Sequence, residues 1–175
     1  MEVAMQLQND KFNVAGKRGR APTSSDPFTP DAALPGIQTC RRCHAVYRNR
    51  SWTLDEQEYE QAVQQEHHPT TCPACLKTDQ HYAEGVVTLT GAYLWEHEEQ
   101  ILNLIRNEEH RALEKNPLER ILRLQREGES LIIETTDIKL AEHLGRAIHK
   151  AHRGELHFSW AGSPAVGRIQ WQRSL

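Results

Sequence analysis

Apolar residues follow no regular spacing at the start of this chain and become periodic only toward its end. Residues 1–36 contain four prolines and three glycines and show no apolar periodicity. Such a segment cannot bury enough surface to offset the entropy lost on ordering, so we expect a flexible, disordered basic arm over 1–36. Periodic spacing runs through 83–175, which predicts an α/β domain, and 37–82 forms a separate module between the two.

The first half of the 83–175 region predicts one strand followed by two helices. An apolar run predicts a strand over 85–94, and helical spacing predicts a long helix over 95–115. Asn116 followed by Pro117 is typical of an N-cap and a first helical residue. A second helix is therefore expected from Pro117 to Gly128, where glycine ends it.

The second half of this region predicts a strand, a helix and two further strands. Leu131–Ile133 is typical of a short buried strand, and Asp137 caps a helix that Gly154 ends. Two strands follow, in which Phe158 and Ile169 alternate with polar neighbours. The order β-α-α-β-α-β-β predicts a mixed sheet with helices packed on one face. With the middle module included, the expected fold class is α+β.

Composition changes the picture in the middle module, which holds every cysteine of the chain. The cysteines form two Cys-x-x-Cys pairs, Cys40 with Cys43 and Cys72 with Cys75. Four soft thiolates are the ligand set of a tetrahedral structural zinc site. We therefore predict a zinc ribbon over 37–82 that binds one structural Zn²⁺ ion. A Thr53-x-x-Glu56 capping box adds a helical insert over 54–66.

Three other uses of these cysteines stay open at this point, and a fourth reading changes the ligand set. Disulfides are disfavoured because the first fifteen residues show no secretory signal. Thioredoxin-type redox chemistry needs one Cys-x-x-Cys and not two matched pairs. Cys40 to His44 matches the pattern of c-type haem attachment, but that would leave the second pair without a role. His44 could also replace one cysteine as a ligand, although a residue directly after a knuckle often points outward.

Charge is distributed unevenly along the chain. Residues 1–53 carry a net charge of +4 and residues 54–175 carry −7, which gives −3 overall. A basic front end on an acidic body predicts a localised face for a polyanion. The expected phosphate contacts are Arg41, Arg42, Arg48 and Arg50, with Tyr47 and Trp52 placed to stack on unpaired bases or to form the small core of the ribbon.

The arm adds its own basic cluster. Lys17, Arg18 and Arg20 resemble the core of an AT-hook, a motif that reads the DNA minor groove, but Ala21 stands where the hook requires proline. The same residues suit an arm that lies along RNA phosphates. Both nucleic acids therefore remain candidate partners.

Other features argue against membrane and enzyme classes. No apolar stretch approaches the roughly 20 residues of a membrane span, so we expect a soluble, cytoplasmic protein with no membrane partner. The ten histidines form no His-Glu-x-x-His motif. A closed four-sulfur site leaves no position for a substrate, and no catalytic constellation is recognisable. We therefore expect a protein that is not an enzyme.

Two regions together resemble a known family. A four-cysteine ribbon precedes an α/β domain that contains the runs Ile105–Glu109, Asn116–Ile121 and Thr135–Asp137. Over most of residues 15–172 this resembles a family of small bacterial zinc-ribbon proteins. These are in turn similar to the amino-terminal region of the large ribosomal subunit nuclear export adaptor, whose additional cysteine pairs and export signals this chain lacks. The resemblance implies association with RNA or the ribosome.

The expected function is therefore non-catalytic RNA binding through the zinc ribbon and the arm, with rRNA or the ribosome as partner. The α/β domain would dock a protein or rRNA surface, or hold the ribbon in place. Two alternatives stay open: a DNA-associated regulator that uses the AT-hook-like arm, and a protein-interaction scaffold with an acidic face.

Overall fold

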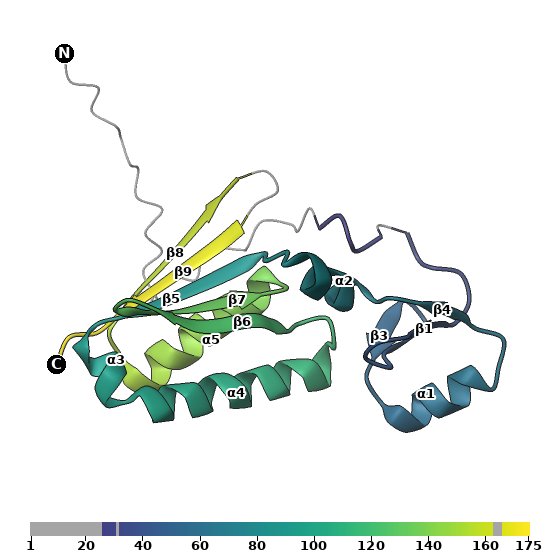
Figure 1. The fold of residues 1–175 in the computed structure, drawn as a ribbon, viewed down its shortest axis with the longest axis horizontal. Coiled ribbons are helices and arrows are strands. Elements are labelled where there is room, and N and C mark those ends of the chain that lie inside the picture. Colours follow the sequence, from purple (N-terminus) through teal and green to yellow (C-terminus); the bar gives the residue numbers. More distant parts are fainter. Residues whose placement is uncertain (1–25, 31, 163–165) are drawn as a thin grey trace, which may run out of the picture.

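The computed structural model describes residues 26–30, 32–162 and 166–175, and it contains two sheets and five helices in these ranges (Figure 1). The arm residues Lys17, Arg18 and Arg20 lie outside the described residues. The described part of the arm, after residue 25, has no helix or strand. It is nevertheless tied to the rest of the chain, because Asp26 lies 2.6 Å from the Lys77 ammonium.

The smaller sheet belongs to the cysteine-bearing module. Its order is β3-β2-β1-β4, and the strands are β1 (Gln38–Cys40), β2 (Val46–Arg48), β3 (Ser51–Thr53) and β4 (His68–Thr70). Strand β1 pairs antiparallel with β2 and parallel with β4. The parallel pair requires a crossover, and α1 (Glu56–Val63) supplies it. The predicted helical insert is thus confirmed, although it begins after Asp55, whose carboxylate accepts from the Glu58 N–H at 2.9 Å.

Helix α2 (Pro73–Gln80) joins the two parts of the molecule and was not predicted. Cys72 is its N-cap and Pro73 occupies its first turn, which suits proline because its missing N–H has no partner there anyway. Figure 1 shows α2 between the small sheet and the larger one. The second cysteine pair therefore lies at the boundary between the module and the following domain.

The larger sheet is mixed, as predicted. Its order is β6-β7-β5-β9-β8, and only β5 and β9 run parallel. The strands are β5 (Gly85–Thr90), β6 (Ile121–Glu127), β7 (Ser130–Thr135), β8 (Glu155–Ala161) and β9 (Val166–Gln172). The helices are α3 (Ala92–Glu96), α4 (Glu98–Lys115) and α5 (Ile138–His152). Helices α4 and α5 cover the same face of the sheet (Figure 1).

The helix predicted over 117–128 is wrong, because these residues form a turn and strand β6. The Asn116 side chain caps a turn by accepting from the Leu118 N–H at 3.1 Å, and the chain then pairs antiparallel with β7. The order in this domain is therefore β-α-α-β-β-α-β-β. Local capping signals were overridden by a hairpin that turns at Gly128, whose φ is +58°.

The core of this domain lies between the sheet and the two long helices. Alternate residues of β5, β7 and β9 are buried, as expected for strands with one covered face. Gly145 brings α5 close to the sheet, since a Cβ there would lie 2.5 Å from Ile169 Cγ2. No helix in the described ranges is long and apolar enough to cross a membrane.

Candidate metal centre

Two local devices hold the first cysteine pair. Cys40 ends β1, and the chain then turns so tightly that the His44 N–H donates to the Cys40 carbonyl at 3.1 Å. His44 has a φ of +64°, which lets the turn close before Ala45. The Cys40 N–H donates to the Ala45 carbonyl at 2.8 Å. This knuckle points both sulfur atoms to one side.

The second pair depends on the start of α2. Cys72 Sγ accepts from the Cys75 N–H at 3.5 Å, and Cys40 Sγ accepts from the Cys72 N–H at 3.3 Å. Cys72 is the N-cap and Cys75 lies one turn further along the helix. The exposed N–H groups of a helix start favour negative charge, so this position suits thiolates.

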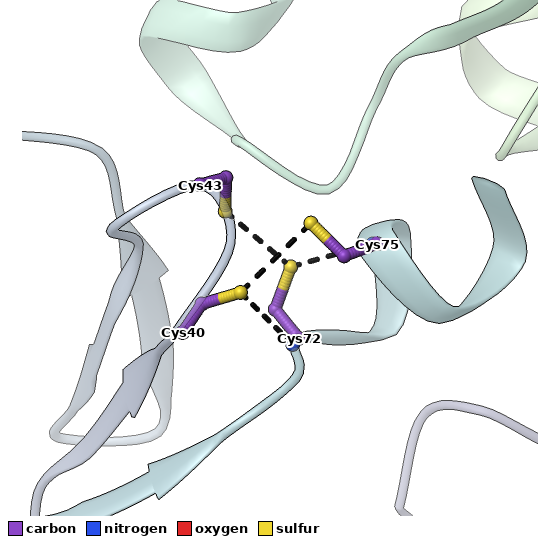
Figure 2. A group of neighbouring side chains, drawn as sticks. All are labelled: Cys40, Cys43, Cys72 and Cys75. Atoms are coloured by element: carbon purple, nitrogen blue, oxygen red, sulfur yellow. Dashed lines mark hydrogen bonds between the residues drawn. The ribbon is translucent and has the colours of Figure 1, made fainter. Parts of the chain in front are cut away.

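The four sulfur atoms form one compact group. All lie within 4.8 Å of one another, with 3.8 Å between Cys40 and Cys75 and 3.6 Å between Cys43 and Cys72 (Figure 2). A tetrahedron with metal–sulfur bonds of about 2.3 Å has sulfur–sulfur edges of about 3.8 Å. The four predicted ligands are therefore brought together at a spacing that fits a single metal ion.

Two of the alternatives, a disulfide and His44 as a ligand, do not fit this arrangement. All four cysteines are free thiols, and a disulfide would need about 2.05 Å between sulfurs. His44 does not stand in for one of the cysteines, since the four sulfurs gather without it. Its ring stacks on Tyr59 with centroids 4.1 Å apart, and its Nδ1 lies 3.0 Å from Glu56 Oε1. Most of the group is enclosed, because Cys40, Cys72 and Cys75 are buried, while Cys43 is partly buried.

A residue that sequence reasoning missed completes the centre. The Arg120 guanidinium donates to Cys43 Sγ at 3.2 Å, to Cys75 Sγ at 3.4 Å and to Cys72 Sγ at 4.0 Å. Arg120 precedes β6 in the other domain, so its cation reaches the cysteines from outside their module. Its backbone N–H donates to Thr136 Oγ1 at 2.8 Å, which fixes the arginine in place.

Charge and hydrogen bonding shift the pKa values of the thiols in opposite directions. The pKa of Cys43 falls to about 4, first because Cys72 donates to it and further because of the Arg120 guanidinium. The pKa of Cys72 is raised by the same shared proton and by burial, and burial raises the pKa of Cys75. Burial alone would lower the pKa of Arg120, but the neighbouring sulfurs raise it above its ordinary value. A divalent cation would replace the shared protons and balance the crowded thiolates.

The four arginines predicted to contact phosphate differ in exposure and in their partners. Arg41 and Arg50 are exposed and have no ion pair within the described ranges. Arg42 forms an ion pair with Asp79. Arg48 is partly buried, and its Nε and Nη2 have no hydrogen-bond partner among the residues that the structure describes. Arg41 and Arg50 are thus the two arginines of this set available to a ligand.

The two aromatic residues form part of a packed surface. Tyr47 and Trp52 are direct partners across β2 and β3, with ring centroids 5.4 Å apart. Tyr47 is 8% exposed, and its hydroxyl accepts from the Leu34 N–H at 3.1 Å. Trp52 is half-buried beside the cysteine cluster. Tyr47 therefore belongs to the interior, and Trp52 keeps an accessible part.

Two of the three runs that carry the family resemblance, Asn116–Ile121 and Thr135–Asp137, reach the cysteine cluster, whereas Ile105–Glu109 lies within α4. Leu118 packs against the cysteine cluster, and its carbonyl accepts from Thr136 Oγ1 at 2.6 Å. Comparison of the chain with protein-family models, curated proteins and solved structures found no match to any of them. Geometry and residue chemistry therefore carry the functional inference.

Proposed function

We propose that the four cysteines bind one structural Zn²⁺ ion and that the module built around it binds RNA without catalysing a reaction. An all-sulfur, closed, four-ligand group with tetrahedral spacing supports zinc. A full set of four thiolates, which satisfies tetrahedral zinc without a substrate position, supports a structural role. Free thiols at such a site suit a reducing compartment, the cytoplasm.

The observation that carries RNA binding is the position of Arg41 and Arg50. Both are exposed without an ion pair in the described part of the chain, one in the knuckle and one in the turn between β2 and β3. Unpaired arginines beside a rigid metal module suit phosphate contact. The sequence is basic over residues 1–53 as a whole, which also favours a polyanionic partner, and the family resemblance points to rRNA or the ribosome.

Binding to labelled RNA over a range of salt concentrations tests the proposal. Each phosphate contact adds about 0.7 to the salt slope for a single strand, so Arg41→Ala with Arg50→Ala should lower both affinity and slope. Lys17, Arg18 and Arg20, replaced together by alanine, should lower the slope further. A/T-rich duplex DNA is the competitor. Tighter binding to this duplex, or binding to neither nucleic acid, would overturn the proposal.

Ribosome association has a separate test. Lysate fractionated on sucrose gradients at low and high salt should show the protein with ribosomal particles at low salt and released at high salt, because electrostatic contacts weaken with salt. If the protein migrates only with free protein at low salt, it does not associate with ribosomes. The RNA-binding proposal would then depend on the titration described above.

A further inference from the structure

A groove of about 620 Å³ lies among the cysteine-bearing module, the end of α4 and the chain segment before β1, which contributes Thr29, Pro30, Ala32, Ala33 and Leu34. The module contributes Tyr47, Arg50 and Trp52, while Lys115 and Leu118 come from the last residue of α4 and the turn after it. Residues more than 60 positions apart in the sequence therefore line one hollow. Its volume lies within the range of small-molecule sites.

The walls of this groove are aromatic and fixed. Tyr47 and Trp52 stand opposite each other on neighbouring strands, and the Tyr47 hydroxyl is held by the Leu34 N–H. Trp52 packs against the cysteine cluster, so the metal module supports it from behind. A rigid, half-exposed indole provides a surface on which a planar ring can stack at little entropic cost.

The charged residues described along this groove, Arg50 and Lys115, are both basic. Both are exposed, neither has an ion pair within the described ranges, and none of the described residues that line the groove is acidic. Lys115 also lines a second hollow, between α4 and α5, whose charge is mixed. There Arg111 and Arg146 are paired with Glu108 and Glu142. The aromatic groove therefore has the charge that an anionic ligand requires.

We propose that this groove holds one unpaired nucleotide of single-stranded RNA, with its base on Trp52 and its phosphate between Arg50 and Lys115. This rests on the proposed RNA binding and names its site. A stacked base satisfies the aromatic wall, and the adjacent phosphate satisfies two cations that come from different parts of the fold. Lys115 lies outside the ribbon, so the following domain takes part in the contact.

A charge-matched pair of variants tests the groove. The probe is a fluorescently labelled 12-nucleotide oligouridine, titrated by anisotropy at several salt concentrations. Lys115→Glu should weaken binding by about 10-fold and lower the salt slope by about 0.7, the amount expected for one lost phosphate contact. Lys150→Glu makes the same charge change on an exposed lysine in the last turn of α5 and should change affinity by less than about 2-fold.

Stacking has its own variants. Trp52→Ala should weaken binding by about 5- to 150-fold, the range for loss of one stacked base, and Trp52→Phe should retain most of the affinity. Metal content and circular dichroism check that each variant is folded. Because Trp52 supports the metal module, Trp52→Phe and Lys115→Glu remain informative where the alanine variant unfolds.

The outcomes separate the two proposals. If the unaltered protein does not bind the oligonucleotide, the proposed function and this inference both fall. Suppose instead that the unaltered protein binds. If Lys115→Glu then has the same affinity as Lys150→Glu, and both Trp52 variants have the affinity of the unaltered protein, the groove is not the site. RNA binding would then stand without it. The inference would also be overturned if a peptide bound in the groove and oligouridine did not displace it.

Discussion

Arg120 shows how much one side chain can decide. Its guanidinium reaches three of the four sulfurs, while its backbone is held by Thr136 and its Nε donates to the Pro117 carbonyl at 2.7 Å. A tetrathiolate zinc site carries a net charge of −2, and a cation hydrogen-bonded to its sulfurs lowers the cost of burying it. Arg120 also links the four cysteines to a domain that contributes none of them.

Replacement of this arginine should weaken metal binding. For Arg120→Gln we expect metal affinity to fall by about 10- to 100-fold, the usual effect of losing an outer hydrogen-bond partner of a metal ligand. Arg120→Lys, which keeps the charge but not the fork of donors, should lie between. Competition with a chromophoric chelator measures the affinity. The control is Arg123→Gln, which changes an exposed arginine of β6. Equal metal affinities for Arg120→Gln and Arg123→Gln would contradict the role of Arg120 in supporting the metal ligands.

At the scale of elements, helix α5 packs unusually close to strand β9 at Gly145. Glycine in a helix interior usually costs about 1 kcal/mol relative to alanine, so Gly145 must be retained for another reason. A Cβ at this position would meet Ile169 Cγ2 at 2.5 Å and Leu156 Cδ1 at 3.3 Å. The spacing between helix and sheet therefore requires a residue without a side chain.

Gly145→Ala should destabilise the protein despite its better helix propensity. Overpacking costs typically about 1–3 kcal/mol, which exceeds the propensity gain. Urea unfolding measures the change in the free energy of unfolding. Lys150→Ala, on the exposed side of the same helix, should be neutral within about 0.5 kcal/mol. A Gly145→Ala variant more stable than the unaltered protein would mean that the helix and sheet are further apart than described.

The two parts of the molecule meet around α2 through polar contacts and through the packing of Leu118 against the cysteine cluster. Lys77 is 5% exposed, and its ammonium donates to the Thr136 carbonyl at 2.7 Å and lies 2.6 Å from Asp26. The small body has few buried apolar residues of its own, whereas the larger one has an extensive core. Stability of the module should therefore come largely from its metal.

Metal removal should loosen the two bodies unequally. With a strong chelator we expect protease cleavage and fast amide exchange in residues 37–80, while residues 83–175 stay protected by their own core. Hydrogen exchange read by mass spectrometry makes the comparison, and restoration by added Zn²⁺ is the control. Equal protection of 37–80 with and without chelator would exclude a structural metal.

Acid should destabilise the larger body through His152. This residue is 8% exposed, and burial, His97 and Arg173 together lower its pKa below the ordinary 6.5. The unfolded chain therefore binds a proton more readily than the folded one. The contribution of His152 to stability is complete above pH 6.5 and is lost as the pH falls toward its folded-state pKa.

His152→Asn should reduce the loss of stability between pH 7.5 and pH 5.5, as measured by urea unfolding at both values. The amide can replace the imidazole Nδ1 near the Tyr93 hydroxyl, which lies 3.2 Å away. His81→Asn is the control, because His81 is exposed and its φ of +50° suits asparagine. An unchanged pH dependence in His152→Asn would exclude this histidine as the cause.

The sequence by itself determined the features that depend on local spacing. Two Cys-x-x-Cys pairs set the four candidate ligands, and the structure brings them together. Apolar periodicity located α4, α5, β7 and the strand pair at the end of the chain. These predictions hold because short spacing and period are properties of neighbouring residues and need no distant partner.

Only the tertiary structure decided what depends on residues far apart in the chain. Residues 121–127 have a local helix signal, but they form a hairpin with β7, and β7 is held in the sheet by pairing with the distant strand β5. Nothing in the sequence indicates that Arg120 donates to Cys43. Nothing in it indicates that Lys115 lines the same groove as Trp52. Long-range strand pairing and the meeting of charges from separate bodies are set by how the whole chain packs. Local sequence spacing carries no information about either.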